Sequence, residues 1–94
     1  MSETRTVDVV ITGRVQGVGF RVWTKHQAEL HGLSGHVRNR EDGSVAATFS
    51  GAPEAIEAML KACAQGPRGS DVTAVTVSEA GGPAGRRGFE IRGA

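Results

Sequence analysis

Alternating apolar and polar positions mark the first structured segment of the chain. Val7, Val9 and Ile11 occupy every second position, which is the period of a strand with one buried face. The pattern predicts a strand that ends at Gly13. From about Phe20 the apolar spacing becomes helical and continues until Gly32 stops it. The residues predicted to share the apolar face of this helix are Phe20, Trp23, Gln27, Ala28 and Leu30.

Two further runs with a tight-turn signal between them predict a hairpin. The runs cover residues 33–39 and 45–50, and in the second run Val45, Ala47 and Phe49 fall on one face. The segment between them contains the dipeptide Asp-Gly at positions 42 and 43. Asp-Gly between two strands is a strong signal for a tight turn, so we expect the two strands to pair in antiparallel fashion.

A proline followed by acidic residues opens the second helical pattern. Pro53 suits the first position of a helix, and Glu54 and Glu57 suit its positive end. Residues 65–70 end this helix as a loop. The residues that recur at helical spacing are Ala52, Ile56, Met59, Leu60 and Cys63. On this stripe Cys63 is expected to be a buried, inert thiol.

Three segments complete the pattern after the second helix. Residues 72–78 are β-branched and alternating, residues 80–88 are rich in glycine, and residues 89–92 form a short last strand. The predicted order is β-α-β-β-α-β with a brief fifth strand, an α+β ferredoxin-like two-layer sandwich. We expect a mostly antiparallel sheet with both helices on one face. Residues 1–94 form one predicted domain, with a polar lead-in at residues 1–5.

Composition limits the classes of function. The 94 residues carry a formal net charge of +1, and 22% of them are charged, so neither strong attraction to nucleic acid nor an acidic tail is indicated. The single cysteine cannot form an internal disulfide, and no apolar run resembles a signal peptide or a membrane span. We expect a cytoplasmic monomer with no membrane or nucleic-acid partner.

The stretch from Gly13 to Arg21 joins the first predicted strand to the first predicted helix. Gly17 and Gly19 can adopt positive φ angles and admit a ligand close to the backbone, and N–H groups at a helix N-terminus attract anions. The helix dipole disfavours an arginine in the first turn, whereas a bound phosphate or carboxylate would favour it. The glycines alone also fit an ordinary turn with solvated arginines. The stretch lacks the lysine of a Walker loop and the third glycine of a dinucleotide fingerprint.

Asn39 ends the second predicted strand just before the tight turn. In the predicted sheet the first strand is central and lies beside the strands that follow, so Asn39 can lie beside the glycine-rich loop. A carboxamide at that place can orient a water molecule, because it both donates and accepts hydrogen bonds. The alternative, which the residue taken alone favours, is a local cap of the turn backbone.

Three motifs together closely resemble the acylphosphatase family. They are GRVQGVGFR at residues 13–21, GHVRN at residues 35–39 and DGSV at residues 42–45, and the resemblance continues over nearly the whole chain to FEIR at residues 89–92. It implies a small ferredoxin-like enzyme that uses no metal or other cofactor and hydrolyses the carboxyl-phosphate bond of acyl phosphates. By the family's pattern Arg21 binds the phosphoryl group and Asn39 positions the attacking water. The same pattern implies a cradle of backbone amides at Val15, Gln16, Gly17, Val18, Gly19 and Phe20.

Two positions depart from the family's pattern, in which a tryptophan usually stands at His36 and an acidic residue is common at Ala46. Neither falls on a predicted catalytic residue, and we expect His36 to face solvent. His26 and His31 have no cysteine or carboxylate partner at metal-ligand spacing, so no metal site is expected.

Two other classes of function remain as alternatives. Domains resembling this one occur within larger maturation proteins, so a phosphate- or carbamoyl-phosphate-binding module without turnover is the chief one. The presence of both Arg21 and Asn39 argues against it. RNA-recognition domains share the predicted architecture but stack bases on exposed aromatic residues of the central strands. This chain contains no tyrosine, and Phe49 and Phe89 fall on faces assigned to the core.

Overall fold

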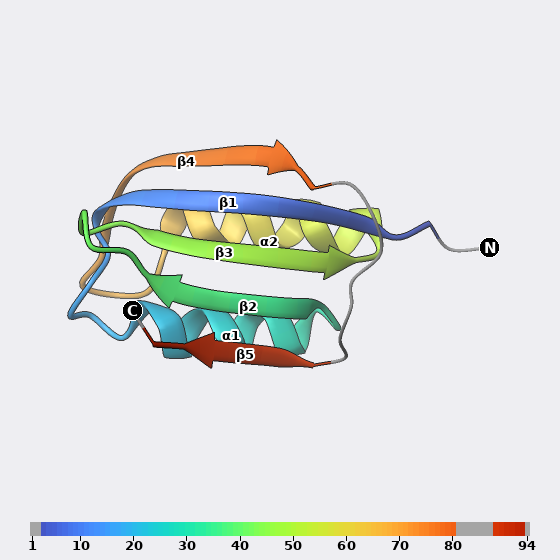
Figure 1. Ribbon diagram of the computed structural model, residues 1–94, viewed down its shortest axis with the longest axis horizontal. Helices are drawn as coiled ribbons and strands as arrows, with labels where there is room; N and C mark the ends of the chain where they lie inside the picture. The colour runs from blue at the N-terminus through green and yellow to red at the C-terminus, as the bar shows by residue number, and fades with distance from the viewer. Residues whose placement is uncertain (1–2, 81–87, 94) are drawn as a thin grey trace.

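A computed structural model describes residues 3–80 and 88–93 of the chain (Figure 1). Both helices lie against one face of a five-stranded sheet, which confirms the predicted α+β sandwich. Residues 81–87, which carry most of the predicted glycine-rich turn, lie outside the described residues. The elements follow the order β1 (Arg5–Arg14), α1 (Phe20–Leu30), β2 (Ser34–Asn39), β3 (Val45–Gly51), α2 (Pro53–Gln65), β4 (Asp71–Glu79) and β5 (Phe89–Arg92).

The sheet has the strand order β4-β1-β3-β2-β5. β1 forms antiparallel pairs with β3 and β4, and β2 forms an antiparallel pair with β3. The pairing of β5 with β2 is parallel. The mostly antiparallel sheet is therefore as predicted. β1 is an inner strand, but β3 lies between it and β2, so Asn39 is not on a neighbour of β1 as the sequence argument assumed.

The core fills the space between the sheet and the helices. The rings of Phe49 and Phe89 stack there with centroids 5.6 Å apart, so the predicted core faces of β3 and β5 are confirmed. The buried apolar residues of β1, β3 and α2 are Val7, Val9, Ile11, Val45, Ala47, Phe49, Ile56, Met59 and Cys63. They are all positions that the alternating and helical patterns assigned to the core. Of the other two residues predicted on the stripe of the second helix, Leu60 is half-buried, whereas Ala52 is exposed and precedes α2, so its assignment is wrong.

The apolar face of α1 differs from the predicted one at its end. Leu30 is 66% exposed, so its assignment to the core face is wrong. The helix ends at this residue, and the Leu33 N–H donates to the Ala28 carbonyl at 2.8 Å, which folds the chain back so that Leu33 packs in the core. Trp23 is half-buried and meets the Phe20 ring edge to face, with centroids 5.2 Å apart. The buried residues of α1 are Phe20, Thr24 and Ala28.

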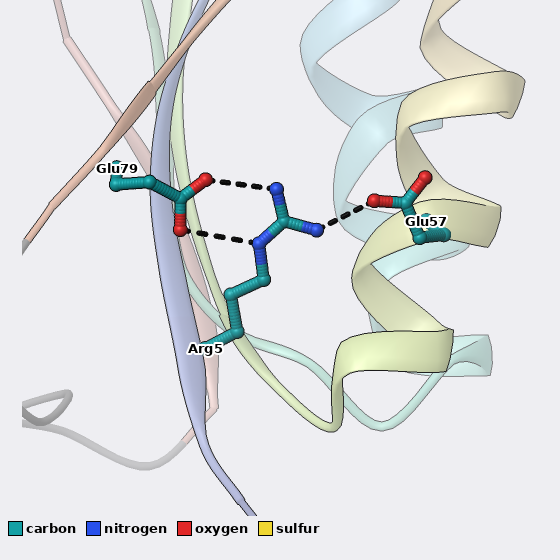
Figure 2. A network of polar contacts seen from close by, with 3 residues as sticks. All are labelled: Arg5, Glu57 and Glu79. Atoms are coloured by element: carbon teal, nitrogen blue, oxygen red, sulfur yellow. Dashed lines mark hydrogen bonds and ion pairs between the residues drawn. The ribbon is translucent and has the colours of Figure 1, made fainter.

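A cluster of charged side chains joins the start of β1 to β4 and to α2 (Figure 2). The Arg5 guanidinium donates two hydrogen bonds to the Glu79 carboxylate on β4, at 3.2 and 2.8 Å, and one to Glu57 on α2. These hydrogen bonds raise the pKa of Arg5 and lower that of Glu79. The cluster therefore fixes the edge strand β4 and helix α2 to the beginning of the chain.

Candidate active site

The segment between β1 and α1 passes across one end of the sheet, beside the tips of β3 and β2 (Figure 1). Just before this segment, within the last residues of β1, the register of β1 on β4 shifts between Thr12 and Gly13. Gly13 has a φ of 118°, and a Cβ atom there would lie 2.1 Å from the Asp71 carbonyl oxygen. Only glycine fits, because both the backbone angle and the close approach of β4 exclude a side chain.

Gly17 and Gly19 are required for a different reason. Their φ angles are 77° and 76°, yet a Cβ atom at either position would meet nothing within 4 Å. The constraint is therefore the left-handed backbone itself, which costs a residue with a Cβ about 1–2 kcal/mol. The same open space lets a ligand approach the backbone of the loop.

The N-terminus of α1 is free to bind an anion. Gly19 precedes the first turn and makes no side-chain cap, and the first turn contains no acidic residue. The first intrahelical bond runs from the Trp23 N–H to the Gly19 carbonyl at 3.0 Å, so the N–H groups before Trp23 in this turn have no helical acceptor. Together with the helix dipole they create a site of partial positive charge.

Three side chains hold the loop in place. Val15 is fully buried and Phe20 is nearly so, which anchors both ends of the loop in the core. Between them the Gln16 Nε2 atom donates to the Arg40 and Ser44 carbonyls, at 2.8 Å each. Gln16 therefore ties the loop to the β2–β3 hairpin by its side chain, a role that the sequence did not indicate because nothing distinguishes this glutamine from a solvated one.

Arg21 and Asn39 line the same pocket at the start of α1. The pocket has a volume of about 150 Å³, whereas drug-sized ligands occupy pockets of about 300–1,000 Å³. A pocket of this volume suits a small chemical group and not a whole drug-sized molecule. Among the described residues of its lining, Arg21 is the one that carries a charge, so the pocket favours an anion. The residues around it are Val15, Gln16, Gly17, Gly19, Phe20, Arg21, Val22 and Asn39.

Arg21 has few partners within the protein. Its Nη1 atom donates to the Arg92 carbonyl of β5 at 3.1 Å, and the described residues offer its guanidinium no carboxylate. A guanidinium has five N–H donors. The bond to Arg92 orients the side chain and leaves most of these donors available to a ligand in the pocket.

Asn39 does not cap the hairpin turn. That role belongs to Asp42, whose Oδ1 atom accepts hydrogen bonds from the N–H (2.9 Å) and the hydroxyl of Ser44. These bonds lower the pKa of Asp42. Asn39 shares the helix-side orientation of Val37 on β2, two residues before it. The turn alternative for Asn39 is therefore wrong, and its half-buried side chain lines the pocket instead.

Other reactive groups lie away from the pocket. Burial raises the pKa of the Cys63 thiol to about 12, so this cysteine is the inert core residue that the sequence predicted. His36 is half-buried on the open face of the sheet, and desolvation, followed by the charge of Arg92, lowers its pKa. Residues 3–80 and 88–93 contain no group of three or more histidine, cysteine, aspartate or glutamate side chains that could hold a metal ion.

The fold and the pocket together define a small α+β protein that presents backbone amides, a guanidinium and a carboxamide to an anionic group. Comparisons with known proteins identify the class further. A family model described as acylphosphatase matches residues 7–91. The acylphosphatase of Azorhizobium caulinodans is 47% identical over 88 residues, covering 94% of this chain and 95% of that protein.

Solved structures agree with this match. The crystal structure of acylphosphatase from Bacillus subtilis gives a TM-score of 0.90 at 34% identity, covering 94% of this chain and 98% of that one. A crystal structure of full-length HypF in its phosphate- and nucleotide-bound form gives a TM-score of 0.84 at 25% identity, covering 99% of this chain but only 12% of that one. The chain belongs to the acylphosphatase family.

Proposed function

We propose that the pocket at the start of α1 is the active site in which this member of the acylphosphatase family hydrolyses acyl phosphates. The observation that carries the proposal is that Arg21 and Asn39, from different elements, line one pocket with the uncapped N-terminus of α1. In this proposal the amides of residues 15–20 and the Arg21 guanidinium hold the phosphoryl group. Asn39 positions the water that attacks it.

The proposed reaction makes modest demands on the protein. The water oxygen attacks phosphorus, the bond between phosphorus and the acyl oxygen breaks, and its electron pair leaves on the carboxylate. The water's proton passes to phosphate or solvent. Because the conjugate acid of the leaving group has a pKa of about 4, departure needs no proton. Positioning and stabilisation of the phosphoryl charge supply the catalysis.

The two side chains have separate roles in this account. Arg21 is oriented by the Arg92 carbonyl and can place its remaining N–H donors on two phosphoryl oxygens, as the fork geometry of guanidinium allows. The Asn39 carboxamide makes no side-chain hydrogen bond to another described residue. It is therefore free to accept a hydrogen bond from a water molecule and to orient that water towards the phosphoryl group.

A phosphate-binding module without turnover is the second candidate, because the HypF structure shows this fold within a much longer chain. The presence of both Arg21 and Asn39 in the pocket favours catalysis. So does the match over 95% of the length of the A. caulinodans acylphosphatase. We also propose that the protein acts on small acyl phosphates as a cytoplasmic monomer, independently of nucleic acid. No helix in residues 3–80 or 88–93 is long and apolar enough to cross a membrane.

The proposal is tested by hydrolysis of benzoyl phosphate in the presence of EDTA. Arg21→Ala should lower kcat/KM about 1,000-fold or more and weaken binding of inorganic phosphate, as loss of a phosphoryl-binding arginine does in related chemistry. Asn39→Ala should lower kcat about 100-fold, the scale of one lost transition-state contact. It should leave phosphate affinity nearly unchanged, because water placement matters only to reaction.

Arg68→Ala is the matched control, since Arg68 is an exposed arginine in the loop after α2. Wild-type turnover in this variant would show that loss of one arginine is not harmful in itself. Absence of hydrolysis in the wild type, with phosphate still bound at the loop, would favour the module. Equal loss of phosphate binding in the Arg21 and Asn39 variants would contradict the division of roles.

A further inference from the structure

On the face of the sheet away from the helices, Arg38 and Arg40 have side chains without a hydrogen-bond or ion-pair partner among the described residues. On β2, Arg38 lies opposite Ala46 of β3 on one side and Arg92 of β5 on the other. Ala46 in turn lies opposite Val10 of β1. Arg38 therefore has a methyl group and a second arginine as its cross-strand neighbours, an arrangement in which like charges repel unless an anion lies between or beside them.

The carboxylates of this face are already engaged. Glu90 pairs with the Arg92 Nε atom at 3.5 Å, and Asp8 accepts a hydrogen bond from the Thr48 hydroxyl at 2.6 Å. Within the described residues no hydrogen bond or ion pair involves the side chain of Arg38 or Arg40. Arg38 and Arg40 thus have no carboxylate at ion-pair distance among the described residues, although the charge of Arg40 contributes to lowering the pKa of Asp42, after the hydrogen bonds from Ser44.

A hollow of about 300 Å³ lies between these arginines and the inner strands. The small side chain of Ala46 contributes to its floor, and Arg38 and Arg40 are the basic residues of its lining. Asp8 is the one carboxylate among the described residues that line it, and His36 contributes little charge at neutral pH because desolvation, followed by the charge of Arg92, lowers its pKa. The residues around it are Asp8, Val9, Val10, His36, Arg38, Arg40, Ala46, Ala47 and Thr48.

This hollow and the proposed active site lie on either side of the end of β2 and share lining residues with the same depression. A corner depression is lined by residues 38–42. It shares Asn39 with the pocket at the start of α1 and shares Arg38 and Arg40 with the sheet-face hollow. Successive side chains of a strand point to opposite faces, so the arginines flank Asn39 from the other side of the sheet. The acidic residues of the corner are Glu41 and Asp42, both exposed, and the pKa of Asp42 is lowered by hydrogen bonds from Ser44 and by the charge of Arg40.

We propose that Arg38 and Arg40 form a second anion subsite, which selects acyl phosphates whose acyl part carries its own negative charge. The inference rests on the proposed function, since it assumes that the phosphoryl group occupies the pocket of Arg21. The acyl part of the bound substrate then extends out of that pocket past Asn39 and along the corner depression. There it places a carboxylate or phosphate beside the two guanidinium groups. Both arginines are specificity-determining residues and take no part in bond breaking.

The test compares two substrates of nearly the same shape. These are 4-carboxybenzoyl phosphate, which carries a second negative charge, and 4-carbamoylbenzoyl phosphate, its neutral counterpart. At low ionic strength the wild type should prefer the charged substrate about tenfold in kcat/KM, which corresponds to ~1.4 kcal/mol. The preference should fall as salt is added, because screening weakens partly exposed charge pairs.

Five variants locate the effect. Arg38→Gln and Arg40→Gln should each reduce the preference, and the double variant should abolish it. Ala46→Glu places a carboxylate opposite Arg38 and should also reduce it. Lys61→Gln removes one positive charge from an exposed position of α2, on the helical side of the sheet, and should keep the wild-type preference. The measured quantity is the ratio of kcat/KM for the charged substrate to kcat/KM for the neutral one. This ratio is unaffected by a change that lowers turnover of both substrates equally.

The possible outcomes separate this inference from the function on which it rests. If the wild type hydrolyses neither substrate, the proposed function itself is wrong. Equal hydrolysis of both substrates, or a preference that survives in the double variant, overturns the subsite while leaving the function intact. A preference lost in the arginine variants and in Ala46→Glu, but kept in Lys61→Gln, supports the subsite.

Discussion

Two arginines at opposite ends of β1 have contrasting surroundings. At the start of the strand, Arg5 donates three hydrogen bonds to the carboxylates of Glu57 and Glu79 (Figure 2). Beyond its end, in the first turn of α1, Arg21 donates one hydrogen bond to a backbone carbonyl. The ten residues of β1 separate the two regions by about 30 Å, at ~3.3 Å per residue.

The difference teaches how to distinguish a structural arginine from one that binds a ligand. Arg5 neutralises its charge within the protein, so its contribution is to hold β4 and α2 to β1. Arg21 keeps most of its donors unsatisfied beside an uncapped helix N-terminus. Hydrogen-bond donors that have no partner within the protein and that line a pocket can be satisfied by a bound ligand.

Replacement of each arginine by lysine should give the largest difference in turnover between the two regions. Lysine keeps the positive charge but loses the planar fork. We expect Arg21→Lys to lower kcat/KM for benzoyl phosphate about 100-fold or more, the scale of a lost transition-state contact, while the melting temperature stays near that of the wild type. Arg5→Lys should keep wild-type turnover. Normal turnover in Arg21→Lys would show that charge alone suffices in the pocket.

Loss of the hydrogen bonds by which Gln16 joins the β1–α1 loop to the β2–β3 hairpin should have an intermediate effect. Gln16→Leu removes both hydrogen bonds from Nε2 and leaves the Arg40 and Ser44 carbonyls without this donor. We expect a loss of about 1–3 kcal/mol in the free energy of unfolding, measured by urea denaturation. Turnover should fall by up to ~100-fold, because small displacements of a catalytic loop are costly. A stable variant with full activity would mean that the core anchors alone hold the loop.

The smallest effect is expected from the cluster at the start of β1, and it should depend on pH. The folded-state pKa of Glu79 is lowered, first by its hydrogen bonds with Arg5. A group with a lowered pKa stabilises the fold above its unfolded-state pKa, and the stabilisation is lost as pH falls through the folded value. Arg5→Gln should therefore lower the melting temperature by a few degrees at pH 7.

The same difference should begin to shrink as pH falls below the unfolded value of Glu79, about 4.3, and should vanish once pH has fallen through the lowered folded value. Turnover at pH 7 and at a temperature well below melting should be unaffected by this substitution. A melting difference that is independent of pH would mean that Arg5 stabilises the protein by packing and not by its charge.

Much of the fold could be predicted because its signals are local. The alternation at Val7, Val9 and Ile11 and the Asp-Gly turn each determine an element through neighbouring residues, and the structure agrees with them. The end of α1 could not be read in this way. Leu30 has the right spacing for the core, but a backbone hydrogen bond beyond the helix brings Leu33 there instead.

The site was predicted less completely for a physical reason. Arg21 and Asn39 could be proposed from their residue types and motifs, and the pocket contains both. The anchoring by Gln16 and the orientation of Arg21 by the Arg92 carbonyl depend on contacts between distant segments. Such contacts follow from tertiary packing, and a glutamine or a backbone carbonyl carries no local sequence signal for them.

The central claim is that the phosphoryl group binds at the start of α1, and a titration with inorganic phosphate followed by two-dimensional NMR of the ¹⁵N-labelled protein tests it directly. We predict that the largest saturable shifts occur at the backbone amides of residues 15–20 and at the Arg21 Nε–H, and that Arg21→Ala removes them. Amides around Arg5 should not shift. Saturable shifts confined to another region, in a protein that still hydrolyses benzoyl phosphate, would contradict the account.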